Sequence, residues 1–243
     1  MTAPPAPTAP PPPRGAGPDH PTRRRSRGWW PAVLALVVVG FLAAELPAYV
    51  TLDPATSRIP PRPGYPPHYA LLVGHILFGS VALLAGCLQV WPWLRCRRPA
   101  VHRWAGRVYL FGGVFPAGVL VLGVAPVSST GFVSSVGNTL LAVLWLLTSA
   151  AGYRAARRRR FTEHRAWMLR SMALTCSIVV NRGWLVLFLI VLTPFTDSAF
   201  GGSEAAMVRA AAGGSVWCSW VVNLLVVEWW LLRPRPARAR VEA

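Results

Sequence analysis

The chain has 243 residues, of which 53% are apolar and only 14% charged, and its mean hydropathy is +0.42. A typical soluble domain has about 25% charged residues, so this composition predicts an integral membrane protein. It excludes a cytosolic enzyme, a disulfide-stapled secreted domain and a free nucleic-acid-binding protein.

The chain begins with a segment that lacks the residues of a folded core. Residues 1–27 contain nine prolines within the first 21 positions, followed by a cluster of arginines. Such a composition is typical of a disordered tail, and its arginines are suited to anionic lipid headgroups. We expect the membrane domain at 28–233, with a core at 69–193, and a second tail at 234–243.

Six apolar segments follow the first tail, each close to the roughly 20 residues that a helix needs to cross a bilayer. The expected spans are 29–50, 69–91, 106–126, 132–153, 167–193 and 214–232. They predict an all-α, polytopic membrane helix bundle. The first apolar run is too long for a signal peptide, so we expect an uncleaved anchor.

The arginines predict the orientation of the bundle. All 25 basic residues are Arg, and 21 of them fall in the two tails and in the second and fourth connections. The opposite side carries only Arg58, Arg62 and Arg209. The positive-inside rule therefore places both termini in the cytoplasm, and the net charge of +17 mostly reflects topology. The Arg-, Ala- and Pro-rich usage is typical of a high-GC bacterium, which predicts the bacterial inner membrane. The expected partners are the bilayer and its anionic headgroups, with no nucleic acid.

Two cytoplasmic connections share the pattern R-x-x-x-H-R. One runs from Arg98 to Arg103 and the other from Arg160 to Arg165, an offset of 62 residues. The pattern favours a parallel duplication of a two-helix unit. It would place His102 and His164 at one depth across a pseudo-twofold axis. The alternative is a chance likeness between two Arg-rich connections.

Polar residues inside the spans are costly and mark candidate sites. The set comprises Glu45, His75, Gln89, Asn138, Asn181, Arg182, Asn223 and Glu228. We expect Glu45, His75 and Arg182 to meet in the bundle interior, with Arg182 paired to Glu45 or to a bound anion. The competing interpretation is a purely structural ion pair at a helix crossing.

A second polar cluster is expected at the cytoplasmic boundary around His102 and His164. Its other members are Arg103, Arg107, Glu163, Arg165, Arg170 and Glu228. One interpretation is a site for an anionic headgroup, a quinone head or a haem propionate. The other is that the arginines bind lipid phosphates while the histidines cap helices.

The sequence lacks the signals of a metal or hydrolytic centre. No Cys/His spacing fits zinc, and the four cysteines are expected to be small hydrophobes. A b-type haem would need two axial histidines at matched depth, from among His75, His102 and His164. A transporter would show broken helices in corresponding halves. The third span carries Gly112, Gly113 and Pro116, whereas no matching break is expected in the fifth.

The quoted motifs resemble a family of bacterial multi-pass membrane proteins known only as a domain of unknown function. That family pattern has a His and a Gln on one helix, then HRxxGRxY, then HRxWMxRS. Its polar signature falls on His75, Gln89, His102, Arg103, Gly106, Arg107, Tyr109, His164, Arg165, Trp167, Met168, Arg170, Ser171 and Arg182. The resemblance implies the fold and a membrane location, and it carries no substrate. The His-bearing helices also resemble, at the level of fold, b-type cytochrome domains.

Three functions remain open at this point. The leading hypothesis is a small binding or accessory membrane protein, without catalysis of its own, that holds a lipid, quinone or other amphipathic ligand. The second is a redox protein linked to haem b or quinone, with His75, His102 and His164 as ligands or proton carriers. The third is a proton-coupled transporter that uses Glu45, His75 and Arg182.

Overall fold

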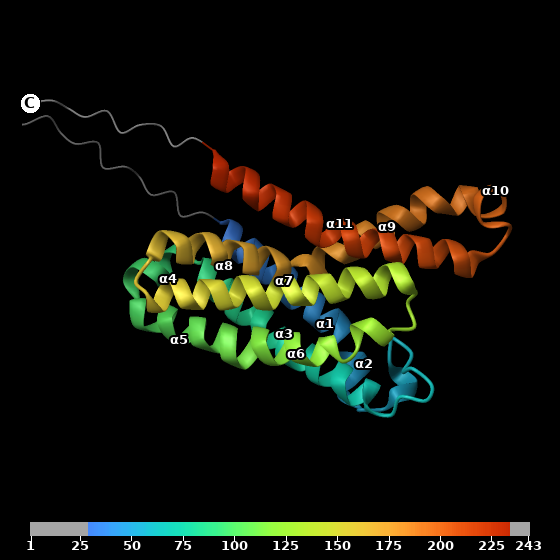
Figure 1. Cartoon of the computed structure of the whole chain (residues 1–243), viewed down its shortest axis with the longest axis horizontal. Helices are drawn as coiled ribbons and strands as arrows, with labels where there is room; N and C mark the ends of the chain where they lie inside the picture. The colour runs from blue at the N-terminus through green and yellow to red at the C-terminus, as the bar shows by residue number, and fades with distance from the viewer. Residues whose placement is uncertain (1–28, 234–243) are drawn as a thin grey trace, which may run out of the picture.

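The computed structural model describes residues 29–233, and every regular element in that range is helical. The expectations for the tails at 1–27 and 234–243 lie outside the described residues. The helices run roughly antiparallel along one long axis (Figure 1). One end carries α4 and the α7–α8 connection, and we call it the Arg-rich end. The opposite end carries α2 and α10.

The first half of the chain makes three passes along the bundle. Helix α1 (Trp30–Glu45) ends at a kink before α2 (Pro47–Val50). Helix α3 (Pro67–Val90) returns to the Arg-rich end, where α4 (Pro92–Arg97) turns the chain. The third pass is built from α5 (Pro99–Tyr109), a π-helical turn at Leu110–Val114, and α6 (Phe115–Leu122).

The second half also makes three passes. Helix α7 (Phe132–Arg157) leads to α8 (Phe161–Thr175), which continues as α9 (Ser177–Leu192). After the short α10 (Thr196–Phe200), α11 (Glu204–Leu232) runs back along α9 and α7. Short 3₁₀ turns occupy Pro54–Thr56, Ala125–Val127 and Thr193–Phe195. Helices α9 and α10, with the first part of α11, extend past the other helices (Figure 1).

The predicted membrane helix bundle is confirmed. Within the described range, five helical segments are long and apolar enough to cross a membrane, and α1 is a shorter apolar helix. The boundaries differ most in the third and sixth spans. The third pass begins at Pro99 instead of 106, and α11 begins at Glu204 instead of 214. Both R-x-x-x-H-R motifs therefore lie mostly within the first turns of helices.

The fifth pass contains a break that the sequence analysis did not expect. Helix α8 ends at Thr175 and α9 begins at Ser177, so the expectation that the fifth span has no break matching the third was wrong. The Ala173 carbonyl accepts a hydrogen bond from Asn223 Nδ2 of α11 at 3.0 Å, and the Leu174 carbonyl accepts one from Ser177 Oγ at 2.6 Å. These bonds satisfy backbone groups that would be costly to leave unpaired in lipid.

The structure relates the third and fifth passes at the predicted offset of 62 residues. Arg98 and Arg160 immediately precede α5 and α8. The π-helical turn that ends at Val114 corresponds to the break at Cys176. Tyr109 and Ser171, also 62 apart, are hydrogen-bonded to each other at 2.6 Å. The duplication of a two-helix unit stays a prediction.

Glycines allow the helices of the core to approach closely. A Cβ on Gly113 would lie 2.8 Å from the Cα of Ala82, so the π-helical turn touches the backbone of α3. A Cβ on Gly86 would lie 2.8 Å from Met172 Sδ of α8. These contacts surround a buried core that includes Tyr109, Trp145 and Trp220.

Candidate functional site

A cavity of about 560 Å³ lies among α1, α3, α7, α9 and α11, in the part of the bundle away from the Arg-rich end. Its volume falls within the roughly 300–1,000 Å³ that is usual for small-molecule sites. Most of the wall area is apolar, with Trp145 among the lining residues. Glu45, His75 and Arg182, which were expected to meet, all line this one cavity.

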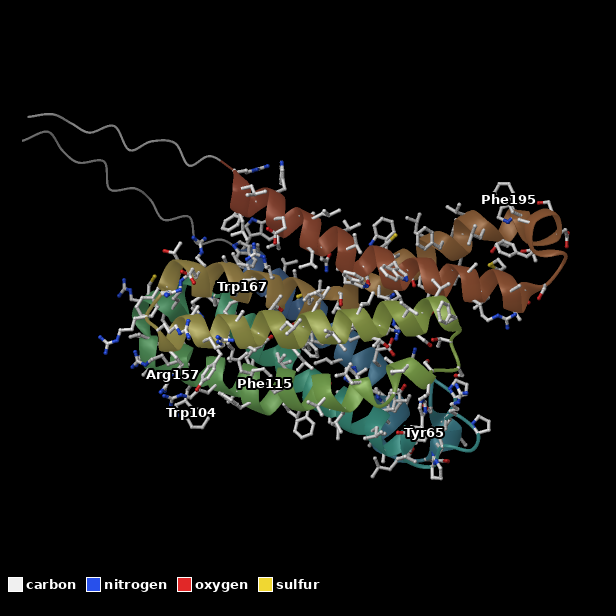
Figure 2. All side chains as sticks on the ribbon, viewed as in Figure 1. Tyr65, Trp104, Phe115, Arg157, Trp167 and Phe195 are labelled. Carbon is white, nitrogen blue, oxygen red and sulfur yellow. The ribbon has the colours of Figure 1, made fainter. Side chains whose placement is uncertain are left out.

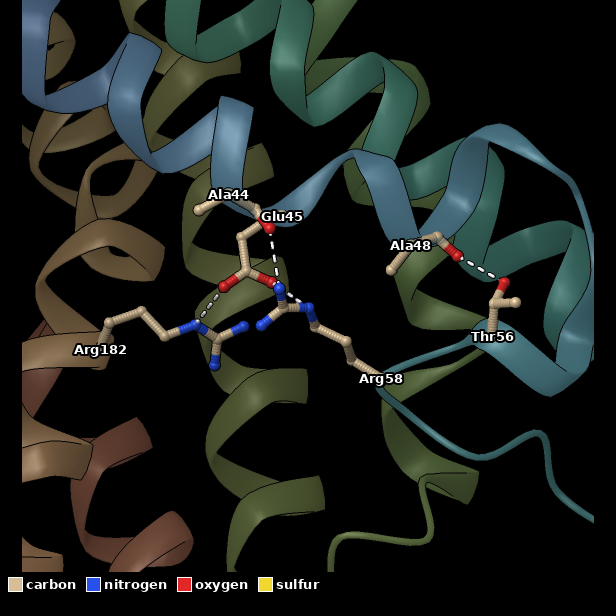
Figure 3. Close-up of polar contacts among 6 residues, drawn as sticks. All are labelled: Ala44, Glu45, Ala48, Thr56, Arg58 and Arg182. Carbon is tan, nitrogen blue, oxygen red and sulfur yellow. Dashed lines mark hydrogen bonds and ion pairs between the residues drawn. The ribbon is translucent and has the colours of Figure 1, made fainter.

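An ion cluster of three residues lies in the cavity wall (Figure 3). Arg182 Nε donates to Glu45 Oε1 at 3.1 Å, and Arg58 Nε lies 3.5 Å from Glu45 Oε2. The Glu45 side chain is 15% exposed, whereas those of Arg182 and Arg58 are 42% and 52% exposed. One guanidinium comes from α9 and the other from the connection before α3, so with Glu45 the cluster carries a net charge of +1.

The two arginines are held differently. Pro47 has no N–H and breaks the helix after Glu45, and the neighbouring Ala44 carbonyl accepts a bond from Arg58 Nη2 at 2.7 Å. Arg58 therefore also stabilises the kink. Arg182 makes one recorded hydrogen bond, through Nε, which leaves its Nη groups without a partner among the described residues. These Nη groups are the spare donors of the cluster.

His75 faces the cavity with a defined tautomer. Its Nδ1 lies 2.9 Å from the Ala117 carbonyl, which can only accept, so Nδ1 carries the proton. In the neutral ring Nε2 is then an acceptor. The bond to α6 orients the ring, and this leaves Nε2 available to a ligand hydroxyl or acid.

Further polar side chains in the same wall lack some of the hydrogen bonds that they could make. Ser134 is 1% exposed, and its Oγ has no hydrogen-bond partner among the described residues. Asn138, one turn further along α7, makes no recorded hydrogen bond there. Asn181 donates through Nδ2 to Ser215 Oγ at 3.1 Å, which leaves its carbonyl oxygen unused. Buried polar groups are normally paired, so this wall is suited to a polar ligand group.

The second predicted cluster, at the Arg-rich end, is organised by bonds within the protein. We call the contacts around Gln89, His102, Tyr109, His164 and Ser171 the motif interface. Gln89 Nε2 donates to the His102 carbonyl at 2.8 Å, and His164 Nδ1 bonds the Gly152 carbonyl at 2.9 Å. His102 and His164 are close enough to interact electrostatically. His102 Nδ1 is buried without a partner among the described residues.

The Tyr109 hydroxyl lies inside a buried network of side-chain hydrogen bonds. It bonds Ser171 Oγ at 2.6 Å and Thr175 Oγ1 at 2.7 Å, and Trp145 Nε1 donates to Thr175 at 2.9 Å. Ser149 Oγ bonds Ser171 at 2.7 Å. Tyr109 is 1% exposed, so these bonds join α5, α7 and α8 and leave its hydroxyl no route to a ligand. The network touches the cavity only through Trp145 and Thr175.

The arginines of the motifs lie at the periphery. Arg103, Arg107 and Arg165 are exposed, and the Arg165 guanidinium stacks 5.0 Å from the centre of the Trp230 ring. Arg170 binds Glu228 through both carboxylate oxygens, at 2.5 and 2.8 Å. Trp104, Arg157 and Trp167 lie toward the Arg-rich end, away from Tyr65 and Phe195 (Figure 2).

The histidines proposed as haem ligands are divided between the two regions. His75 lines the cavity, while His102 and His164 belong to the motif interface. Within residues 29–233 no three His, Cys, Asp or Glu side chains gather in a way that could hold a metal ion. A haem- or quinone-linked role stays a prediction, which the absorption spectrum of the purified protein, recorded with haem supplied during expression, tests.

Sequence reasoning missed two of the residues that shape the cavity, Ser134 and Ser215. Single serines in apolar helices are common, and only their depth and lack of partners distinguish them. A Cβ on Gly79, one turn from His75 on α3, would have nothing within 4 Å. Gly79 lines the cavity, so a side chain added at this position would enter it.

Comparison with known proteins gives a family and no activity. No curated protein and no solved structure matches the chain. The family model described as "Predicted membrane protein (DUF2306)" matches residues 72–231, from α3 to the last turn of α11. Glu45 and Arg58 lie before the matched range, whereas His75 and Arg182 lie inside it. The chain therefore belongs to this family of membrane proteins of unknown function.

Proposed function

We propose that this protein is an intramembrane binding protein that holds an amphipathic ligand in the cavity. The observation that carries the proposal is a cavity, mainly apolar in area, whose wall contains an ion cluster with spare donors and an unpartnered buried hydroxyl. An apolar space with a few convergent polar groups is the usual form of a ligand site. The ligand's apolar part would occupy the space beside Leu72 and Leu83, and its polar part would face Arg182 and His75.

The surroundings of the cavity favour a ligand taken from the bilayer. Helix α1 packs mainly on α3, and α9 packs mainly on α11. Two contacts connect α1 with α9. Val179 of α9 packs on the cluster around Val38 and Leu42 of α1, and Arg182 of α9 bonds Glu45 of α1. This seam between α1 and α9 would serve as a lateral entrance for a lipid-soluble molecule.

We also propose the orientation that the arginine count predicts. The Arg-rich end would face the cytoplasm of a bacterial inner membrane, with its exposed arginines and tryptophans among anionic headgroups. The cavity would then lie in the outer half of the bilayer. Cysteine labelling of intact cells at Cys96 and at a Ser57→Cys variant tests this orientation, because an impermeant reagent should react only at position 57.

Native mass spectrometry of the protein purified in a neutral maltoside detergent tests the binding function. Wild type should retain a bound amphiphile, and Gly79→Leu should lose it, because the leucine fills the cavity without meeting the backbone. Gly40→Leu is the matched control: its Cβ also meets open space, and the residue is exposed on α1 outside the cavity. Equal retention of the amphiphile by all three proteins would contradict the proposal.

One observation supports proton-coupled transport as a second candidate. The third and fifth passes are interrupted at matched positions, Leu110–Val114 and Cys176, and such paired breaks often mark the binding site of a transporter. The transport reading predicts ligand-dependent acidification of liposomes that contain the protein and a trapped pH dye. The signal should disappear in Arg182→Gln, and its absence in wild type would exclude this candidate.

A further inference from the structure

The charge of the ion cluster narrows the chemistry of the ligand. Among the described residues that line the cavity, the charged side chains are Glu45, Arg58 and Arg182. With His75 neutral, they sum to +1. Arg182 is the intramembrane arginine of this set, and such an arginine is normally neutralised by a partner. Glu45 divides its negative charge between Arg182 and Arg58. One added monoanion would bring the cluster to neutrality, whereas a neutral head would leave it charged and a dianion would overcompensate it.

The hydrogen-bonding capacity of the cluster points to the same class of head. Arg182 has two Nη groups without a partner among the described residues, and a guanidinium fork matches the two oxygens of a carboxylate. Glu45 itself shows that the cluster accommodates a carboxylate, since its two oxygens lie 3.1 and 3.5 Å from the two Nε atoms. A second carboxylate could bind Arg182 without breaking that bond.

The rest of the cavity suits a single chain. The residues of α3 that line it run from Leu72 to Leu83, which corresponds to roughly 16 Å along the helix. Trp145 and Leu174 line the part of the cavity nearer the middle of the bundle, and both are buried. The space is therefore long, and its wall beyond the ion cluster is mainly apolar in area, with hydroxyl and amide groups such as Ser134 and Asn138 among the lining residues.

We propose that the ligand is a single-chain amphiphile with a carboxylate head, bound by Arg182, and that Glu45 sets the charge of the head that the site accepts. This inference rests on the proposed binding function. With Glu45 ionised the site takes a monoanion. Without that negative charge the cluster would carry +2 and would favour a dianionic head, such as a phosphate monoester.

Competition among three probes with the same chain tests the inference. Palmitic acid, hexadecanol and hexadecyl phosphate are added together at pH 8, where a phosphate monoester with a second pKa of about 6 is dianionic. Occupancy is measured by native mass spectrometry. Wild type should prefer palmitate over hexadecanol by about tenfold or more, as a charge-assisted bond to guanidinium would give. Glu45→Gln should reverse the order of palmitate and hexadecyl phosphate.

Two arginine variants and the cavity variant complete the test. Arg182→Gln should lose the preference for palmitate over hexadecanol, and Arg182→Lys, which keeps the charge, should retain part of it. Equal binding of all three probes by wild type, with loss of all three in Gly79→Leu, would overturn the carboxylate inference while supporting the cavity as the site. Binding of no probe by wild type, or of all probes by Gly79→Leu, would overturn the binding function itself. An unchanged order in Glu45→Gln would overturn the role given to Glu45.

Discussion

The motif interface and the cavity contain similar residue types but differ in how many of them are bonded within the protein. In the motif interface the side chains of Gln89, Tyr109 and His164 all bond to other parts of the protein, and His102 Nδ1 is the exception, buried without a partner among the described residues. In the cavity wall Ser134 and the Nη groups of Arg182 have no such partner among the described residues. Satisfied buried networks hold helices together, and unsatisfied ones are candidates for ligand contact. A polar residue in a span is therefore informative only once its partners are known.

The largest loss of stability is expected where the backbones of two helices touch, with no side chains between them. Gly113→Val would drive a side chain into the backbone of Ala82, and backbone cannot move aside as a flexible side chain can. We expect a loss of about 3 kcal/mol of stability, at the upper end of what overpacking usually costs. Thermal unfolding in detergent measures it, with Gly40→Val as the control. Equal melting temperatures of the two variants would contradict the packing described here.

The second largest loss of stability is expected at the centre of the motif interface. Tyr109→Phe removes a hydroxyl that bonds Ser171 and Thr175, so we expect a loss of about 1–3 kcal/mol without loss of ligand. Tyr153→Phe is the matched control, because the Tyr153 hydroxyl makes no recorded hydrogen bond among the described residues and its ring packs on Phe111. If Tyr109→Phe emptied the cavity while keeping its stability, the two regions could not be separated as proposed.

A pair of serines on α7 gives the smallest and sharpest contrast. Ser149 is fully buried and bonded to Ser171, so Ser149→Ala should cost about 1 kcal/mol. Ser134 is equally buried but unpartnered, so Ser134→Ala should be neutral or slightly stabilising in the ligand-free protein. Denaturant titration of both variants, after ligand removal, checks the sign. Equal destabilisation by the two substitutions would show that Ser134 is satisfied within the protein.

The sequence predicts the parts of this fold that depend on hydropathy and spacing. Apolar length is enough to locate the passes, since each span must cover the bilayer with few charges. The offset of 62 residues predicts that α5 and α8 are equivalent, and the Tyr109–Ser171 bond agrees with it. A partner for Arg182 can be predicted from the free-energy cost of an unpaired charge inside a membrane. Glu45 is the natural choice because few acidic residues lie within the spans.

The remaining features depend on contacts between distant segments. No Pro or Gly marks the break at Cys176, which Asn223 stabilises from α11, 50 residues away from the carbonyl that it bonds. The kink after Glu45 follows from Pro47, yet its bond with Arg58 requires the intervening turn to fold back. The cavity is a gap between helices that are distant in the sequence, and no local pattern encodes a gap. Sequence reasoning therefore found most of the charged residues and could not say which of them faced empty space.

The most direct test of the account compares one substitution from each region for ligand retention. Native mass spectrometry is applied to the Gly79→Leu variant and to the double variant His102→Ala, His164→Ala, each purified beside wild type. The account predicts that Gly79→Leu loses the bound amphiphile, while the double histidine variant retains it at the wild-type level. The reverse pattern, with ligand lost only when His102 and His164 are changed, would contradict the cavity as the binding site and assign that role to the motif interface.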